Sequence, residues 1–241
     1  MPTDDAVRLL RATTLLNQLD ESDLRRLADR AVSRRYSRGQ VVFTEGELSE
    51  TLLVITSGRL KLLTSAEDGR NHVVNIAEVG DTLGELNLVE PGPRTLSAEA
   101  LEPSGALVLD RMAVWELVRE RSAVAEALIR ALAAHVRRLT GANADLVFLD
   151  LPRRVAKFVL FQMREAARPV IEPGLTQTEI ASMLGGSRQS VNQALREFER
   201  RGWLLSEGAS ITVLQPERLA RYAGELTERP AAGTAGAFFL P

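Results

Sequence analysis

Cysteine is missing from the 241 residues of the chain, histidine occurs twice, and aromatic residues account for only 5%. Without cysteine the chain forms no disulfide, thiolate zinc site or cysteine-ligated iron–sulfur cluster, and it has no cysteine nucleophile. His72 and His135 are the only histidines, which is too few for most metal-dependent catalytic sites. The sequence therefore predicts a protein without a metal, a haem or an iron–sulfur cluster, and it argues against an enzyme.

Long hydrophobic runs are also missing. No segment approaches about 18 uninterrupted apolar residues, and the N-terminal "MPTDDAVRLLRATTLL" lacks the apolar core of a signal peptide. We therefore expect a soluble, cytoplasmic protein with no membrane partner. At 45% hydrophobic residues, a chain of this length can bury the cores of one large or two ordinary domains.

The net charge of −2 is unevenly divided along the chain. Residues 1–150 hold 18 basic and 23 acidic side chains, a net −5, whereas residues 151–241 hold 12 and 9, a net +3. The sign of this difference favours an anionic partner for the C-terminal part.

The first half of the chain changes from a helical to a strand pattern. Residues 6–31 read as helical with a cap or turn near Asp20–Ser22. Residues 32–110 then carry short apolar runs separated by glycines. The runs lie at 41–43, 52–55, 59–64, 72–77 and 106–110. Short strands at close spacing with glycine turns predict a compact antiparallel sandwich or jelly roll.

The period becomes helical again over residues 112–149, and the apolar positions alternate in spacings of four and three. The positions are Leu128, Leu132, His135, Leu139, Ala142, Leu146 and Leu149. Such a heptad stripe is narrower than a helix buried in its own domain usually shows, so it predicts a parallel helix pair and a homodimer. His135 is interpreted as a polar residue tolerated on the stripe.

The stretch 175–205, "LTQTEIASMLGGSRQSVNQALREFERRGWLL", has the pattern of a helix-turn-helix. Thr176 and Glu179 have capping-box spacing, Gly185-Gly186 suits a tight turn, and Ser187 suits the cap of a second helix. On the second helix the apolar residues Val191, Leu195 and Phe198 share one face. Residues 203–214 follow as a hairpin that turns at Glu207–Gly208, which predicts a wing.

Polar side chains occupy the opposite face of this second helix. They are Arg188, Gln189, Asn192, Gln193 and Arg196. Long hydrogen-bonding side chains at the start of a helix suit the DNA major groove: Gln189 and Gln193 can pair with adenine, and Arg188 with guanine or phosphate. Thr176, Thr178 and Ser187 are predicted to hold phosphates. The alternative, an ordinary helical hairpin with a polar surface, does not require the cap, the short turn and the wing together.

Residues 84–95, "GELNLVEPGPRT", place a carboxylate and a guanidinium among glycines and prolines. Backbone amides after Gly84, Arg94 and the hydroxyl of Thr95 suit a phosphate, while Glu85 suits a ribose hydroxyl because it only accepts hydrogen bonds. This combination is typical of a nucleotide site. A buried Glu85–Arg94 ion pair that fastens the loop is the structural alternative, and the spacing does not decide between them.

With these stretches, residues 12–225 resemble the cyclic-AMP receptor protein / fumarate–nitrate reductase regulator (CRP/FNR) family of bacterial transcription factors. The resemblance rests on "VVFTEGE", "LLVITSGRLKL", "GELNLVEPGPRT", "DLVFLDLPRRVAK" and "SRQSVNQAL", and it is greatest to actinobacterial cyclic-AMP receptors. It implies that Gly84, Glu85, Leu86, Arg94 and Thr95 form a phosphate-binding cassette for a cyclic nucleotide. It also places Leu139 and Thr140 at the two positions that meet the base.

The fold class that follows is α+β, with a cyclic-nucleotide-binding β-roll, a long dimerisation helix and a winged helix-turn-helix. The expected domains are 1–111 for the β-roll with its N-terminal helices, 112–151 for the dimerisation helix and hinge, and 152–226 for DNA binding. Residues 227–241 are predicted to be a flexible tail, with Phe238, Phe239 and Leu240 as an apolar end.

The function implied is a homodimeric regulator gated by a cyclic nucleotide, with cyclic AMP as the first candidate and cyclic GMP as an alternative, which binds palindromic double-stranded DNA and contacts RNA polymerase. Two departures from the family leave alternatives open. Leu139 cannot hydrogen-bond a base, so DNA binding without a cyclic nucleotide, or another effector such as a cyclic dinucleotide, is the competing hypothesis. Gln189 and Gln193 stand where the receptor that names the family has glutamate and arginine, which predicts an operator other than TGTGA/TCACA.

Overall fold

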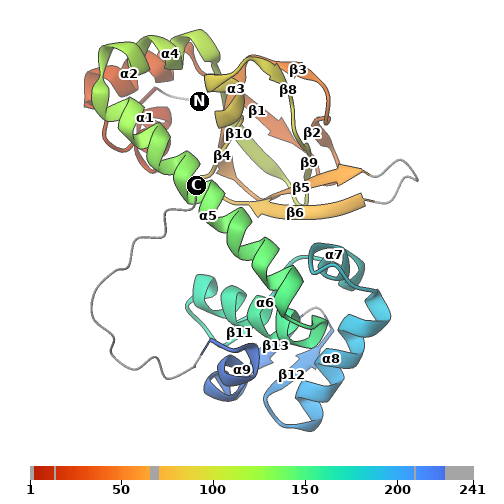
Figure 1. Cartoon of the computed structure of the whole chain (residues 1–241). Coiled ribbons are helices and arrows are strands. Elements are labelled where there is room, and N and C mark those ends of the chain that lie inside the picture. Colours follow the sequence, from red (N-terminus) through yellow and green to blue (C-terminus); the bar gives the residue numbers. More distant parts are fainter. Residues whose placement is uncertain (1–2, 14, 66–70, 209, 226–241) are drawn as a thin grey trace, which may run out of the picture.

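The computed structural model describes residues 3–13, 15–65, 71–208 and 210–225, which form a β-roll, a long helix and a smaller mixed domain (Figure 1). The predicted tail with Phe238, Phe239 and Leu240 lies outside the described residues. Among the described helices, none has both the length and the apolar character needed to cross a bilayer.

The β-roll consists of two four-stranded antiparallel sheets and one short strand pair. The first sheet has the order β1 (Val32–Tyr36), β10 (Ser104–Asp110), β4 (Thr51–Ser57) and β7 (Thr82–Leu83). The second has the order β2 (Val41–Phe43), β9 (Ser97–Ala100), β5 (Leu60–Ser65) and β6 (Asn71–Ala77), and β3 (Leu48–Ser49) pairs with β8 (Gly92–Pro93). The five predicted apolar runs are therefore present as β2, β4, β5, β6 and β10, and the remaining five strands of the roll complete its sheets.

The four helical pieces around the roll pack on its first sheet. They are α1 (Thr3–Arg11), α2 (Glu21–Arg30), α4 (Arg111–Glu120) and the first turns of α5 (Ser122–Phe148). Strand β4 separates two cores, because Leu52 and Val54 face these helices whereas Leu53 and Ile55 face the roll interior. A continuous apolar run is typical of a strand buried on both faces.

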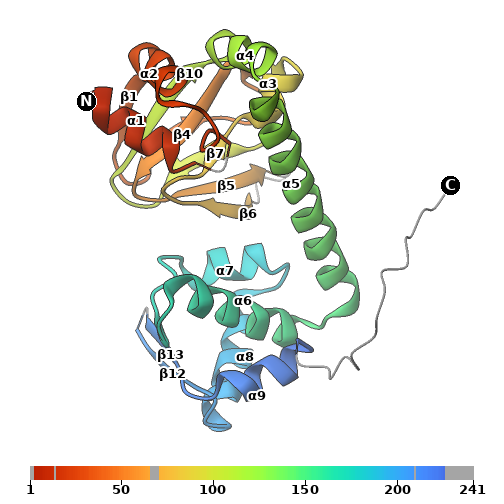
Figure 2. The same cartoon turned by 90° about the vertical axis from the view of Figure 1, so that its left-hand side faces the viewer.

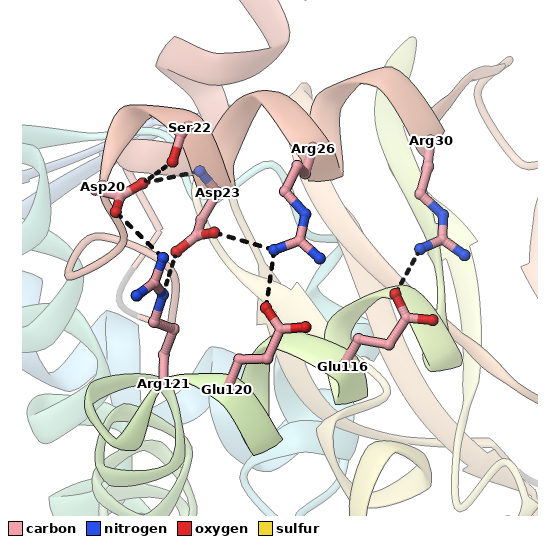
Figure 3. Close-up of polar contacts among 8 residues, drawn as sticks. All are labelled: Asp20, Ser22, Asp23, Arg26, Arg30, Glu116, Glu120 and Arg121. Atoms are coloured by element: carbon pink, nitrogen blue, oxygen red, sulfur yellow. Dashed lines mark hydrogen bonds and ion pairs between the residues drawn. The ribbon is translucent and has the colours of Figure 1, made fainter.

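The helix predicted over residues 112–149 is interrupted at Arg121, which has an extended backbone (φ −128°, ψ 105°) between α4 and α5. Its side chain donates to the buried carboxylate of Asp23 on α2 at 2.8 Å, and Arg26 of α2 joins Asp23 to Glu120 (Figure 3). Arg30 pairs with Glu116 in the same row (Figure 3). The contacts between α2 and α4 thus fix the place where the chain turns into α5.

The heptad stripe predicted on α5 is partly wrong. Leu128 is buried and Leu132 is packed against the helical core of the same chain, because the first turns of α5 belong to that core. The apolar residues that α5 leaves exposed share Leu139 and Leu146 with the predicted stripe. The others are Ile129, Val136, Val147 and Phe148.

A hinge follows α5, where Leu149 is extended and Asp150 caps α6 (Leu151–Ala166). Arg154 of α6 binds both sides of this hinge. Its Nη1 donates to the carbonyl oxygen of Leu149 at 2.8 Å, and its Nε donates to that of Leu184 at 2.9 Å, next to the turn of the helix-turn-helix. Lys157 also pairs with Asp145 of α5 at 2.6 Å. The end of α5 is therefore tied to the C-terminal domain.

The C-terminal domain is a winged helix-turn-helix. Its helices after α6 are α7 (Gln177–Met183), α8 (Arg188–Arg200) and α9 (Pro216–Ala223). The predicted wing is formed by β12 (Leu204–Glu207) and β13 (Ser210–Val213), and β11 (Val170–Ile171) adds a third strand beside β13. Val191, Leu195 and Phe198 are buried as predicted. Helix α7 faces β6 of the roll (Figures 1 and 2).

Candidate functional site

The cassette loop begins with a glycine that the structure requires. Gly84 has a φ of +101°, and a Cβ atom there would lie 2.2 Å from Nη1 of Arg94 and 2.6 Å from the carbonyl oxygen of Thr51. Any other residue would therefore be strained and would collide with the guanidinium. Helix α3 (Glu85–Val89) follows directly. Asn87 of α3 donates to the carbonyl oxygen of Gly92 at 2.7 Å and so holds the loop closed.

Arg94 is only 4% exposed. Its Nη2 donates to the carbonyl oxygen of Thr51 at 3.0 Å and to the hydroxyl of Thr51 at 2.9 Å, while Nε and Nη1 are buried and have no hydrogen-bond partner. The guanidinium also lies 4.4 Å over the ring of Phe43. Burial lowers the pKa of Arg94, against the opposite effect of Glu47 and Glu85. Buried N–H groups without acceptors are costly, so the loop is arranged for an anion.

Glu85 lies beside this arginine without forming an ion pair with it; its carboxylate accepts a hydrogen bond from the hydroxyl of Thr82. Burial raises the pKa of Glu85, against the lowering effects of the Thr82 hydrogen bond and of Arg138. Because Arg94 donates to Thr51 instead, the ion-pair alternative left open by the sequence does not describe this loop.

Two adjoining cavities share Glu85, Leu62 and Leu83. The smaller, about 80 Å³, is lined by the predicted residues Gly84, Glu85, Leu86, Arg94 and Thr95 together with Phe43, Asn87 and Leu96. The larger, about 180 Å³, lies between the roll and α5. Its polar lining includes Asn75, Asp81, Thr82, His135 and Arg138. The cassette therefore opens toward the long helix.

Replacing Glu85 with glutamine is expected to alter how stability depends on pH. The folded pKa of Glu85 is raised above 4.5, so the folded protein binds this proton more strongly than the unfolded chain. The free energy of unfolding should consequently fall as the pH rises from about 4.5 through the folded pKa. Urea unfolding across this range should show a smaller fall for Glu85→Gln than for the wild type, with the exposed Glu90→Gln as the control. Parallel profiles for all three proteins would contradict this role of burial.

Leu139 and Thr140, the predicted base contacts, do not line either cavity. Both are exposed, and the hydroxyl of Thr140 donates to the carbonyl oxygen of Val136 in its own helix. The contact of Leu139 and Thr140 with a base therefore stays a prediction.

His135 and Arg138 line the larger cavity, a position that the sequence interpretation missed. His135 was assigned to the dimer stripe, whereas its side chain lies 3.3 Å from Arg138 and faces the roll. Burial, with a smaller effect of Arg138, lowers the pKa of His135. Its helical spacing of three from Arg138, and of four from Ala131, could have indicated a second face of α5.

A separate surface lies on α8. Arg188, Gln189, Asn192, Gln193, Arg196 and Arg200 line one open hollow, so the predicted polar face is continuous and accessible. Ser187 caps the helix by accepting from the amide of Ser190 at 3.1 Å, as predicted. This geometry positions side chains at the start of a helix for contacts with base edges.

Helix α7 begins with the predicted capping box. Thr176 accepts from the amide of Glu179 at 3.2 Å, and Glu179 accepts from the amide of Thr176 at 2.9 Å. Thr176 and Thr178 are exposed at this end, where phosphate contacts are predicted. Gly186 leaves no room for a side chain, since a Cβ atom would lie 2.5 Å from Leu151.

Comparison with known proteins agrees with this architecture. Residues 33–121 match the family model of the cyclic nucleotide-binding domain, and residues 153–222 match that of the Crp-like helix-turn-helix domain. The chain is 41% identical over 193 residues to the CRP-like cAMP-activated global transcriptional regulator of Mycobacterium tuberculosis, covering 78% of this chain and 86% of that protein. It is 30% identical to the cyclic AMP receptor protein of Thermus thermophilus, with 70% and 77% covered.

Among solved structures, FixK2 from Bradyrhizobium japonicum has the same fold, with a TM-score of 0.73 at 23% identity over 80% of this chain and 96% of that one. A cyclic nucleotide-binding domain followed by a helix-turn-helix defines a class of DNA-binding transcription regulators, which are not enzymes. The chain belongs to the CRP/FNR family of this class. The predicted fold class and family are thereby confirmed.

Proposed function

We propose that the protein is a homodimeric transcription regulator whose affinity for palindromic DNA is controlled by a cyclic nucleotide, with cyclic AMP as the first candidate. The observation that carries the proposal is the buried guanidinium of Arg94, which has two nitrogens without acceptors at one end of a cavity. A cyclic phosphate supplies the missing acceptors and the compensating charge. The names of the relatives in Mycobacterium tuberculosis and Thermus thermophilus support cyclic AMP.

The arrangement of the two cavities supports a nucleotide rather than a bare anion. A phosphate held by Arg94 and Thr95 places a sugar next to Glu85, whose carboxylate accepts hydrogen bonds from hydroxyl groups. The base then enters the larger cavity, which α5 closes with His135 and Arg138. A ligand in this position contacts both the β-roll and the long helix.

The apolar residues that α5 leaves exposed support a homodimer. Ile129 is 65% exposed and Phe148 is 79% exposed in the single chain, and such residues on one helix are typical of an interface with a second copy. Two copies related by a twofold axis would present two α8 helices to successive major grooves, about 34–36 Å apart. We include RNA polymerase as the partner in transcription.

The competing effectors are cyclic GMP and cyclic dinucleotides. The observation that favours them is the guanidinium of Arg138 in the larger cavity, next in sequence to Leu139, which is apolar and lies outside it. A guanidinium only donates hydrogen bonds, so it suits the acceptor oxygen of guanine better than the amino group of adenine. This second candidate keeps the cassette and changes the base.

Isothermal titration of the purified protein with cyclic AMP and cyclic GMP tests the proposal, followed by operator binding with and without the bound nucleotide. We expect micromolar binding of one nucleotide and a change in operator affinity of about 5- to 150-fold, the usual range of allosteric coupling. Tighter binding of cyclic GMP would select the competing effector. No binding of either nucleotide, with operator affinity unchanged, would overturn nucleotide control.

A further inference from the structure

The first helix of the helix-turn-helix is attached to the nucleotide-binding domain of the same chain. Three hydrogen bonds join Ser182 of α7 to β6. The hydroxyl of Ser182 accepts from the amide of Val73 at 3.2 Å and donates to the carbonyl oxygen of Asn71 at 2.8 Å. The carbonyl oxygen of Ser182 lies 2.8 Å from Nδ1 of His72. Because β6 is the edge of its sheet, its outward amides and carbonyls have no neighbouring strand, and a single serine satisfies two of them.

An ion-pair cluster strengthens the same contact. Lys61 of β5 has only 16% of its side chain exposed and lies 2.9 Å from Glu99 of β9 and 3.0 Å from Glu179 of α7. The second carboxylate oxygen of Glu179 holds the capping box of α7. Lys61 therefore forms an ion pair with Glu179, the residue that caps the start of α7. The pair is partly buried, so it is screened less than an ion pair on an open surface.

A third contact holds the segment that leads into α7. Arg59 pairs with Glu102 of the roll and donates through Nη1 to the carbonyl oxygen of Pro173 at 3.0 Å. The guanidinium lies so close to the next residue that a Cβ atom at Gly174 would be 2.2 Å from Nη2. The backbone at Pro173 and Gly174 therefore packs closely against the side chain of Arg59, and Gly174 leaves the space that the guanidinium occupies.

The strands that carry these contacts also line the nucleotide cavity. Lys61 faces α7, whereas its neighbour Leu62 faces the two cavities, because successive side chains of a strand point to opposite faces. On β6, Asn71 to Val73 hold α7, and Asn75 and Ala77 line the larger cavity. The strand pair β5–β6 therefore has one face on the ligand and one on the DNA-binding domain.

We propose that Lys61 of β5, Arg59 beside it and Ser182 of α7 are positioning residues for DNA recognition, and that β5 and β6 carry the nucleotide signal directly to α7. The positioning role of these residues requires only that the C-terminal domain binds DNA. The signalling role of β5 and β6 also requires the nucleotide control proposed above. This connection acts in parallel with the hinge at Leu149, and it does not pass through α5.

Lys61→Met and Ser182→Ala, singly and combined, test both parts, with Arg8→Met as a matched control in the exposed ion pair that Arg8 forms with Asp5 on α1. Since the chain has no cysteine, spin labels can be attached at the exposed positions Ser33→Cys on the roll and Arg218→Cys on the C-terminal domain, with unlabelled chain in excess. We expect the distance distribution between the labels to broaden in all three variants and to stay unchanged in the control. An unchanged distribution in the folded double variant would overturn the positioning role.

The signal is tested by the ratio of operator dissociation constants without and with saturating nucleotide. We expect this ratio to fall by at least about threefold in the double variant, since coupling of 5- to 150-fold is usual, while titration still detects nucleotide binding. If the double variant has the same ratio of dissociation constants as the wild type but a broadened distance distribution, the positioning role is supported and the signalling role is overturned. If the wild type binds neither cyclic AMP nor cyclic GMP, both the proposed nucleotide control and the proposed signalling role of β5 and β6 are overturned. The distance distribution between the labels then tests the positioning role by itself. If Lys61→Met does not fold, Ser182→Ala provides both measurements.

Discussion

Replacing Arg94 with methionine is expected to abolish cyclic-nucleotide binding while leaving the ligand-free protein as stable as the wild type. The two free nitrogens of the guanidinium are available for a phosphate, and each hydrogen bond to a charged group contributes about 1.5–3 kcal/mol. Loss of both weakens binding by about 3 kcal/mol or more, which corresponds to a dissociation constant at least about 100-fold higher. Isothermal titration of both proteins measures this change.

The stability of the same variant follows from burial. Methionine removes the bonds to Thr51 and the contact with Phe43, but it also removes two buried N–H groups that have no acceptor. An unsatisfied buried group costs about 1–3 kcal/mol, so the two effects offset each other to within about 1 kcal/mol. Urea unfolding provides the measurement, and Arg34→Met on the exposed strand β1 is the matched control. A variant that binds nucleotide normally, or one that is destabilised by several kcal/mol without binding it, would contradict an arginine kept for a ligand.

Selection of binding sites from random DNA is expected to give a palindrome whose half-sites differ from TGTGA. Gln189 offers an amide where an acidic side chain would accept from the amino group of cytosine, so selection for that base pair should relax. Gln189→Glu should restore it. One good base contact is worth about 1–3 kcal/mol of discrimination, and two half-sites double this to about 2–6 kcal/mol.

The control for this experiment is Arg200→Gln, at the far end of the same surface. This change removes a positive charge, so it should weaken binding to all sequences alike and reduce the salt dependence without altering the selected half-site. If the wild type selected TGTGA/TCACA, or if Gln189→Glu selected the same half-site as the wild type, Gln189 would not read this base.

Features encoded by neighbouring residues were predictable from the sequence. The capping box at Thr176, the cap at Ser187 and the apolar face of α8 depend on residues within two turns of each other, and all three are present. The grouping of Gly84, Arg94 and Thr95 around one cavity was also predictable, because a closed loop brings its two ends together.

Features that depend on distant contacts were not predictable. The break at Arg121 is fixed by Asp23, which lies 98 positions away in the sequence, and a heptad pattern contains no information about this partner. The same cause misplaced Leu128 and Leu132, whose apolar character suits either a second copy or the core of the chain. The contact of Ser182 with Asn71 spans 111 positions, and a lone serine on a helix gives no signal of it.

Because α5 is long and fixed at both ends, a small change in its tilt at one end produces a large displacement at the other. Its first turns are fixed in the helical core up to Leu128, and its last turn is fastened by Arg154 to the C-terminal domain. From Leu128 to Phe148 the helix extends about 30 Å, at 1.5 Å per residue. A tilt of about 6° at the fixed end therefore moves the other end by about 3 Å, close to the rise of about 3.4 Å per base pair along the DNA axis. A displacement of that size would move α8 along the operator by about one base-pair step.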